Sequence, residues 1–488
     1  MKTYIPLLSL FFLIFAPHIN ANTPQETLQE KDMVIVIASY NNKDWYIKNL
    51  DSVLSQEYDA YRVIYIDDYS PDGTAQLVQE YIDNHPEGHR VTLIKGHERR
   101  GAHANIYRAI TACKNHEIVI IVDGDDWLSH SRVLKTINQY YADENVWLTY
   151  GQYQRYPANT IGICRAIPQQ VIATNRYREY HWVTTHLRTF YAWLFKQVKL
   201  KDFLYQGQFV PSAGDQIGMF GMLEKSGGRF AFIPEVLYRY NRANVINVEK
   251  TGHENAQLQL DLAKYTRKKE KYTPLANEQT DYLDSLHDAT ADVIVFSSES
   301  PEQLHQTIQN IHNSITGVGN IYAVSQTTDF STPEYQQVQQ AFANLYYIDT
   351  NNNNSRLAAF LQPVFDAPAH YLLLTTDNDI ITTSINIPNC VHALERTAAY
   401  GFFFNKTKAS STDTNYFFLY DNIYAWQFTD SDAHNDYSNT IHTTLYRKAD
   451  LYTHVAKMNS LDMFLSQWTK KTVPTEVGLF YDIKPAQL

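Results

Sequence analysis

An apolar run that ends in three carboxylates constrains the fold of this chain more than any other stretch. Residues 118–122 read Ile-Val-Ile-Ile-Val, and Asp123, Asp125 and Asp126 follow within four positions. Such β-branched runs are typical of a strand buried on both faces of a parallel sheet. Neighbouring carboxylates repel one another unless a cation lies among them, and Mg²⁺ prefers oxygen ligands that it shares with phosphates. The stretch predicts a metal–phosphate site at the carboxyl edge of an α/β sheet. A merely acidic surface turn is the alternative.

Apolar segments alternate with amphipathic ones through this part of the chain. The expected strands are residues 33–38, 62–66, 90–95 and 118–122, and the expected helices are residues 45–55 and 101–113. Strands and helices that alternate at this spacing are typical of parallel βαβ units. Right-handed crossovers bring the carboxyl ends of such strands to one edge of the sheet. The turns at Tyr40, Asp67-Asp68 and Asp123–Asp126 are therefore expected to meet in one cleft.

Four short motifs occupy these turns and the start of one helix. They are Ala38-Ser39-Tyr40-Asn41, Asp67-Asp68-Tyr69-Ser70-Pro71-Asp72-Gly73-Thr74, Arg100-Gly101-Ala102 with Asn105, and Asp123-Gly124-Asp125-Asp126. In this order and spacing they resemble the motifs of family 2 glycosyltransferases, although each alone recurs by chance. The resemblance covers residues 33–245, about half of the chain. It implies a Rossmann-like GT-A fold and the transfer of a sugar from a nucleotide-sugar with inversion.

The resemblance also implies which residues hold the donor. Those that match the family's donor-binding segments are Ser39, Tyr40, Asn41, Asp67, Asp68 and Arg100. A carboxylate suits the N–H of a uracil ring, and a tyrosine ring can stack on a base. For Asp67 and Asp68 the alternative is capping of the turn that follows.

The acidic motif at residues 123–126 matches the family's DXD motif. There, one carboxylate contacts the ribose and another binds Mn²⁺ or Mg²⁺ across the diphosphate. We expect Asp125 to be the metal ligand and Asp123 the ribose contact, although the resemblance leaves open which of Asp123, Asp125 and Asp126 ligates the metal. The metal neutralises the leaving nucleoside diphosphate, so no protein acid is needed at that oxygen.

Inversion requires a base for the acceptor hydroxyl. The family's carboxylate base stands at the start of a helix, and Asp215 matches it, just before a helix expected over residues 216–225. The family usually has Glu at the preceding position, where this chain has Gly214. The alternative is that Asp215 is an ordinary helix N-cap.

Residues 180–190 are dense in His, Arg and aromatic side chains, and such a region lines the acceptor side in many enzymes of the family. Arg188 or His186 is suited to a phosphate contact, and we include Arg188 among the donor-binding candidates. Trp182 is suited to stacking on a sugar face. Packing is the alternative for each of them. His181 and His186 do not form a zinc pair, because no third ligand stands at a suitable spacing.

The second half of the chain repeats the pattern of the first. Strands are expected at residues 291–296, 320–324, 346–348 and 371–376. The distance from first strand to acidic tip is about 85–90 residues in both halves. We therefore expect two tandem GT-A-like α/β domains, at residues 33–245 and 289–488, joined by a helical linker over residues 246–288.

The second acidic tip holds Asp377 and Asp379, and its role is open. Residues 325–329 read Ser-Gln-Thr-Thr-Asp where the first half has its Asp-Asp-x-Ser-x-Asp-Gly element. Asp377 and Asp379 are therefore either ligands of a second metal site or relics in a degenerate partner.

The N-terminus bears on location. Lys2 precedes an apolar run over residues 4–16, which is typical of a secretory signal peptide or an N-terminal anchor at residues 1–21. We expect an exported or membrane-associated protein, with the cytoplasmic face of a membrane as the alternative.

Composition narrows the classes of function. The net charge of −11 gives no electrostatic basis for binding nucleic acid. The three cysteines are too widely spaced for a disulfide framework or a zinc site. The hypothesis is a metal-dependent inverting glycosyltransferase of polysaccharide biosynthesis that uses a nucleotide-sugar, with UDP as the default, and a glycan, lipid or protein acceptor. The alternatives are a carbohydrate-binding scaffold without activity and a nucleotidyltransferase.

Overall fold

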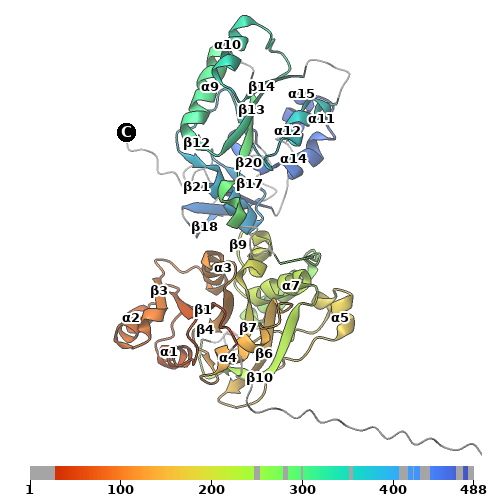
Figure 1. The fold of residues 1–488 in the computed structure, drawn as a ribbon. Coiled ribbons are helices and arrows are strands. Elements are labelled where there is room, and N and C mark those ends of the chain that lie inside the picture. Colours follow the sequence, from red (N-terminus) through yellow and green to blue (C-terminus); the bar gives the residue numbers. More distant parts are fainter. Residues whose placement is uncertain are drawn as a thin grey trace, which may run out of the picture.

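The computed structural model of the chain contains two large β-sheets with flanking helices, which Figure 1 shows one above the other. It describes residues 28–246, 253–278, 284–297, 300–350, 356–405, 416–420, 422–428, 440–468 and 476–481. The predicted signal sequence lies outside these residues. Within them, no helix has the length and apolarity needed to cross a bilayer.

The first sheet has the strand order β3-β2-β1-β4-β7-β6-β10-β5. Its strands are β1 (Met33–Ser39), β2 (Tyr61–Asp67), β3 (Val91–Lys95), β4 (Ile118–Asp123), β5 (Trp127–Leu128), β6 (Leu148–Tyr156), β7 (Arg188–Tyr191) and β10 (Phe230–Asn241). Strands β3, β2, β1 and β4 run parallel, as predicted, and β7 runs antiparallel between β4 and β6.

Helices cover both faces of this sheet (Figure 1). They are α1 (Tyr46–Leu54), α2 (Thr74–Asn84), α3 (Ala102–Ala112), α4 (Val133–Tyr140), α6 (Ala192–Lys196) and α7 (Gly214–Ser226). Alternate residues of β1 enter two different cores: Val34 and Val36 lie in one cluster, and Ile35 and Ile37 in the other. This is the period of two expected for a strand buried on both faces.

The second sheet has the order β14-β13-β11-β15-β20-β17-β21-β19-β18. Its strands are β11 (Ala291–Phe296), β13 (Val318–Ser325), β14 (Leu345–Asp349), β15 (Tyr371–Thr376), β17 (Gly401–Phe403), β18 (Tyr416–Tyr420), β19 (Ile423–Gln427), β20 (Thr444–Arg447) and β21 (Val477–Tyr481). The helices against it include α9 (Pro301–Ser314), α10 (Pro333–Ala341), α13 (Ile387–Thr397), α14 (Lys448–Val455) and α15 (Leu461–Trp468).

The first seven strands of the two sheets follow one plan. Three parallel strands precede the strand with the acidic tip, an antiparallel strand follows, and the next two strands pair in parallel. The predicted tandem α/β fold is therefore confirmed. We call the parts built on the two sheets the first and the second domain. Within the predicted linker, α8 (His253–Lys268) is helical.

The β18–β19 hairpin of the second domain lies against the first domain, next to α3 and β9 (Figure 1). Arg108 Nε of α3 donates to the Leu419 carbonyl at 3.0 Å, and the ring centroids of Phe209 and Phe417 are 5.0 Å apart. Phe209 belongs to a short hairpin of β8 (Leu204–Tyr205) and β9 (Gln208–Phe209). The sequence did not predict this contact.

Candidate active site

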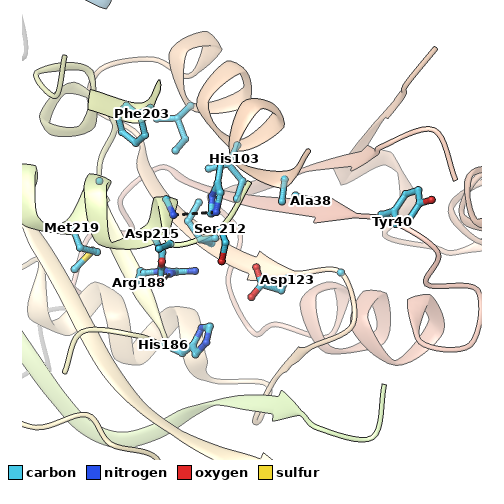
Figure 2. A pocket seen from close by; sticks show the side chains of 18 of the residues that line it. Ala38, Tyr40, His103, Asp123, His186, Arg188, Phe203, Ser212, Asp215 and Met219 are labelled. Carbon is cyan, nitrogen blue, oxygen red and sulfur yellow. Dashed lines mark hydrogen bonds and ion pairs between the residues drawn. The ribbon is translucent and has the colours of Figure 1, made fainter. Parts of the chain in front are cut away.

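A cavity of about 410 Å³ opens where the carboxyl ends of β1 and β4 face the start of α7 (Figure 2). The sheet register explains why the tips meet, because Ala38 of β1 pairs with Asp123 of β4, and Ser39 pairs with Asp67 of β2. Among the predicted site residues, the following line the cavity: Tyr40, Asp123, Asp125, Arg188 and Asp215. Figure 2 shows Asp123 and Asp215 facing the same space, with Tyr40 at its far end.

The three carboxylates of the acidic turn have different surroundings. Asp126 is buried and accepts hydrogen bonds from the Tyr238 hydroxyl at 2.7 Å and the Asn241 N–H at 2.6 Å, so it joins the turn to β10. Asp125 accepts from the side-chain amide of Asn244 at 2.8 Å and lines the cavity, as Asp123 does. Asp126 therefore supports the turn, and Asp123 and Asp125 remain the candidates for a cation.

Burial and crowding raise the pKa values of these two carboxyls. The pKa of Asp125 rises to about 6 because of burial and the nearby charge of Asp123. Burial also raises the pKa of Asp123, against the influence of Arg188. A divalent cation with hard oxygen preference would relieve both effects, so this donor set fits Mn²⁺ or Mg²⁺. Among the described residues no three metal-ligating side chains converge, and such ions commonly complete their shell with water and substrate phosphate.

The turn itself is shaped by a glycine and an asparagine. A Cβ atom on Gly124 would lie 2.6 Å from the Cβ atom of Ser39, so only glycine allows this close approach to β1. Asn49 of α1 donates its side-chain amide to the carbonyls of Asp123 and Asp126, at 3.0 and 2.7 Å. Asn49 could not be predicted from the sequence, because its partners lie more than seventy positions away.

The neighbouring carboxylates Asp67 and Asp68, where β2 ends, have different hydrogen-bond partners. Asp68 accepts from the N–H groups of Arg100 and Gly101 and from the amide of Asn105, at 2.8, 2.9 and 2.8 Å. Both its oxygens thus hold the loop before α3, so its predicted contact with the donor is untested and its evident role is positioning. Asp67 Oδ2 accepts from the Ser70 N–H, whereas Oδ1 is buried with no hydrogen-bond partner among the described residues. A buried lone acceptor of this kind suits an N–H group of a ligand.

Asp215 forms an ion pair with Arg188 beneath α3. The Arg188 Nη1 atom lies 3.0 Å from Asp215 Oδ2, and the two side chains are 8% and 28% exposed. The Gly214 N–H donates to His103 Nε2 at 3.1 Å. Burial lowers the pKa of His103, so the ring is neutral and carries its proton on Nδ1. A Cβ atom on Gly214 would lie 2.5 Å from the His103 ring, which explains why glycine stands where the family usually has Glu.

The remaining donor candidates lie on the rim or beneath it. The Arg99 guanidinium lies 3.9 Å from the centre of the Tyr40 ring. Ser39 is buried and its hydroxyl accepts from Tyr65 and Asn42, so it has a structural role. Asn41 has a positive φ of 54°, and its side-chain oxygen is buried with no partner among the described residues. Arg100 pairs with Glu98 at 2.8 Å.

Two candidates from residues 180–190 are held by neighbouring rings. His186 stacks on Tyr238 with centroids 4.6 Å apart, and burial and Arg188 lower its pKa well below the usual range. A neutral imidazole is a poor partner for a phosphate, so the phosphate contact considered for His186 is disfavoured. Trp182 packs edge-on against Phe220 at 5.4 Å, which leaves Arg188 as the residue of this region that lines the cavity with a charge.

Backbone hydrogen bonds align the second acidic tip with the first. The bond from the Gly124 N–H to the Ala38 carbonyl corresponds to that from the Asp377 N–H to the Phe296 carbonyl. The bond from the Asp126 N–H to the Asp123 carbonyl corresponds to that from the Asp379 N–H to the Thr376 carbonyl. Thr376 therefore occupies the position of Asp123, and Asn378 that of Asp125. Asp379 occupies the position of the supporting carboxylate, Asp126. The acidic pair of the second tip is thus one position out of register with the pair that faces the cavity.

Two further site positions are replaced in the second domain. The hydrogen bond from the Gly96 N–H to the Asp67 carbonyl corresponds to that from the Thr350 N–H to the Ser325 carbonyl. Likewise, the strand pair Ile121–Arg188 corresponds to the pair Leu374–Thr444. Ser325 therefore stands where Asp67 does, and Thr444 stands where Arg188 does. At these described positions, the second domain therefore lacks the carboxylates of Asp67, Asp123 and Asp125 and the guanidinium of Arg188.

Asp377 is buried in the second domain, and the Asp379 carboxylate is bonded there. Asp377 is 1% exposed, and its carbonyl accepts from Gln303 and Thr307 of α9. Asp379 accepts from the Thr376 N–H at 2.9 Å and lies 2.9 Å from His442 Nδ1. The second metal site stays a prediction that no contact here favours.

Comparison with known proteins agrees with the geometry. Residues 34–204 match the model of the family described as Glycosyl transferase family 2. This part, about a third of the chain, is therefore similar to a family 2 glycosyltransferase domain. It carries four of the predicted cavity residues, Tyr40, Asp123, Asp125 and Arg188, whereas Asp215 lies beyond it.

Two curated relatives are glycosyltransferase or polysaccharide biosynthesis proteins by name. The chain is 29% identical over 119 residues to the UDP-Glc:alpha-D-GlcNAc-diphosphoundecaprenol beta-1,3-glucosyltransferase WfaP of Escherichia coli, covering 24% of this chain and 45% of that protein. It is 31% identical over 108 residues to the succinoglycan biosynthesis protein ExoO of Rhizobium meliloti, covering 22% and 29%. The chain thus spans less than half the length of these relatives.

Solved structures show only distant likeness. Staphylococcus aureus TarS residues 1–349 with UDP-GlcNAc is 16% identical, with a TM-score of 0.37 over 48% of this chain and 66% of that one. The mannosyltransferase PcManGT of Pyrobaculum calidifontis, with GDP-Man and Mn²⁺, is 20% identical, with a TM-score of 0.35 over 50% and 66%.

Proposed function

We propose that the chain is a metal-dependent inverting glycosyltransferase with one donor site, in the first domain. It transfers a sugar from a nucleotide-sugar, with a UDP-sugar as the first candidate, to an acceptor hydroxyl. The observation that carries this proposal is the placement of Asp123 and Asp125 across one cavity from the Arg188–Asp215 pair. The family match and the curated relatives support the reaction class.

The nucleotide is assigned to the end of the cavity near Tyr40, beside which the ends of β1 and β2 pair through Ser39 and Asp67. The unpartnered Asp67 Oδ1 would accept an N–H of the base, and the Tyr40 ring offers a face for stacking. Asp125 and Asp123 would hold the Mn²⁺ or Mg²⁺ ion. When bound, that ion supplies positive charge against the departing nucleoside diphosphate.

Asp215 is assigned as the base. As the acceptor oxygen bonds to the anomeric carbon, the bond from that carbon to the diphosphate oxygen breaks, and the acceptor proton passes to the Asp215 carboxylate. Arg188 fixes one oxygen of Asp215, which leaves the other oxygen for the proton. His103 fixes the start of α7 through the Gly214 N–H, and so holds Asp215 in place.

The test is donor binding and hydrolysis by the purified chain without residues 1–21, against a panel of nucleotide-sugars with Mn²⁺ or Mg²⁺. We expect one donor to bind with metal, Asp125→Ala to abolish that binding, and Asp215→Asn to bind without turnover. If no donor binds and metal changes nothing, the proposal fails and a carbohydrate-binding scaffold replaces it. Release of pyrophosphate from a nucleoside triphosphate and a sugar 1-phosphate, with no turnover of any nucleotide-sugar, would indicate a nucleotidyltransferase.

We further propose that residues 1–21 carry the chain to or through a membrane, where a glycan, lipid or protein acceptor is met. The support is the apolar run over residues 4–16. Cell fractionation of the full chain beside a chain without residues 1–21 tests this. Equal distribution of the two in the soluble fraction would contradict it.

A further inference from the structure

A second pocket of the first domain is rich in lysines. Its volume is about 640 Å³, and it lies between the end of α7, the end of α8 and the 3₁₀ turn η3 (Leu200–Phe203). Its charged lining residues are Lys199, Lys201, Asp202, Lys225, Lys269, Glu270 and Lys271. Lys225 follows Asp215 by ten positions on α7, so the pocket lies about 15 Å further along that helix from the candidate active site.

Most of these lysines have a carboxylate partner, but two do not. Lys201 pairs with Glu476 of the second domain, Lys271 with Glu179 at 2.7 Å, and Lys269 with Asp202 at 3.8 Å. Among the described residues, no carboxylate oxygen lies within 4.0 Å of the Nζ atom of Lys199 or Lys225. Two ammonium groups of one pocket thus have no salt-bridge partner among the described residues, and the charges of Asp202 and Glu224 offset only part of the fall in the Lys225 pKa.

Tyr272 contacts both lysines, one through its side chain and one through its backbone. The Lys225 ammonium lies 4.6 Å from the centre of the Tyr272 ring, and the Tyr272 hydroxyl accepts from the backbone N–H of Lys199 at 2.9 Å. Tyr272 is 9% exposed, and its own N–H donates to the buried Glu224. The wall of the pocket is therefore a packed part of the domain.

Without a bound anion, burial and mutual repulsion destabilise the charged form of the lysines in this pocket. The pKa of Lys225 falls to about 8 because of burial and the charge of Lys199. Burial also lowers the pKa of Lys269, which Lys201 and Arg178 reinforce and Asp202 opposes. The carboxyl ends of α7 and α8 favour cations at Lys225 and Lys269. No helix end favours Lys199, which precedes η3, and the chain as a whole is acidic at −11.

We propose that this pocket binds a phosphate-type oxyanion, with a diphosphate as its reference ligand. Lysine ammonium groups bind phosphate oxygens as point charges. Tyr272 contacts the Lys225 ammonium and fixes the backbone at Lys199, the second lysine of the pocket without a salt bridge among the described residues. The volume leaves room for an organic group on the phosphate. The site is separate from the donor site and does not depend on the proposed transferase activity.

The test is calorimetric titration of the chain with inorganic pyrophosphate at pH 7 in EDTA, which removes the metal that the donor site is proposed to need. We expect saturable binding that the double variant Lys199→Gln/Lys225→Gln weakens by about tenfold or more. The matched control, Lys264→Gln/Lys268→Gln, removes the same charge from exposed positions of α8 and should change the affinity less than about twofold. No saturable binding at millimolar pyrophosphate, or an equal loss in the control, overturns the proposal.

A measurement on the unaltered chain guards against misfolding of the variant. The acetylation rates of Lys199 and Lys225, followed by mass spectrometry, should fall severalfold when pyrophosphate is added, whereas that of Lys264 should not change. Equal rates with and without pyrophosphate contradict the proposal. Vesicles that contain phosphatidic acid form a second arm: protection by both pyrophosphate and vesicles assigns the oxyanion to a lipid headgroup, and protection by pyrophosphate alone assigns it to a free ligand.

Discussion

The two sheets share a strand plan but not a site. Both place an antiparallel strand beside the strand with the acidic tip, yet Asp67, Asp123, Asp125 and Arg188 are Ser, Thr, Asn and Thr in the second domain. Each replacement is at a strand end or beyond it, and the buried apolar strand interiors are kept. The fold therefore depends on burial along the strands, whereas the site depends on a few tips that can change without loss of the sheet.

Charged residues of the second domain serve packing instead. Lys448 occupies the position that Ala192 has in the first domain. Each residue directly follows the antiparallel strand, and each donates its N–H to the carbonyl of the residue just before the neighbouring strand, Glu117 for Ala192 and His370 for Lys448. Its ammonium is buried and lies 2.6 Å from Asp292 Oδ2 and 2.6 Å from the Val364 carbonyl. A buried cation with all its bonds inside the protein is typical of a structural role.

The largest expected effect separates the two helices that precede β10 and β21. Asp215 is the second residue of α7, and Asp462 is the second residue of α15, where it accepts from Gln326. Asp215→Asn should lower kcat by about 10³-fold, because the base is lost. Donor binding should persist, because Arg188 remains. Asp462→Asn should leave kcat unchanged. Steady-state kinetics with the identified donor checks both, and a loss of turnover in Asp462→Asn would break the comparison.

The next effect concerns the acidic tips. Asp125→Asn removes a proposed cation ligand and should lower kcat/KM by about a hundredfold or more. Its counterpart in the register is Asn378, so Asn378→Ala should have no effect on activity, and neither should Asp379→Asn. Binding of Mn²⁺ by calorimetry gives an independent readout. If Asp379→Asn removed a metal site while Asp125→Asn did not, the assignment of the two domains would be reversed.

Much of this arrangement could be predicted from the sequence, because the strands β1, β2 and β4 are apolar runs with polar ends. Strand β7 could not: it has only four residues, and only pairing with β4 and β6 identifies it. The same pairing brings Arg188 to Asp215. His103 also escaped prediction, because its contact with Gly214 joins helices 111 positions apart.

The second acidic tip shows where spacing alone misleads. The number of residues from the first strand to the acidic tip aligns Asp377 and Asp379 with the first tip, but this number cannot detect a shift of one residue. In a strand end one residue decides whether a side chain faces the cavity or the interior. Only the hydrogen bonds of Asp377 and Asp379 reveal the shift.

A smaller effect lies in the pH dependence of stability, which should have opposite signs in the two tips. The pKa of Asp125 is raised by burial, so its contribution is favourable below the ordinary value of 3.8 and is lost as pH rises through about 6. For Asp379, burial acts upward, but bonds from His442 and Thr376 hold its pKa below 3.8, so its contribution is present at neutral pH and is lost in acid. At pH 7 without metal, Asp125→Asn should therefore raise Tm and Asp379→Asn should lower it, each by about 2–4 °C. Thermal unfolding at pH 7 and pH 4 checks this, and equal signs at pH 7 would contradict it.

The smallest effect tests whether the second domain acts on the first. The Phe418 ring of the β18–β19 hairpin lies 5.2 Å from the Arg100 guanidinium and 4.8 Å from that of Arg108. Because the Arg100 N–H is bonded to Asp68, which follows Asp67, the hairpin supports the loop at the proposed nucleotide end of the cavity. Phe418→Ala should raise the donor KM by about three- to fivefold through loss of the cation–π contacts, with kcat unchanged. The matched variant Gln427→Ala removes a contact of the same hairpin with Gly207, away from that loop, and should leave the KM unchanged. An equal rise in both variants would mean that the second domain only stabilises the first, and no rise in either would mean that the donor loop holds its shape without it.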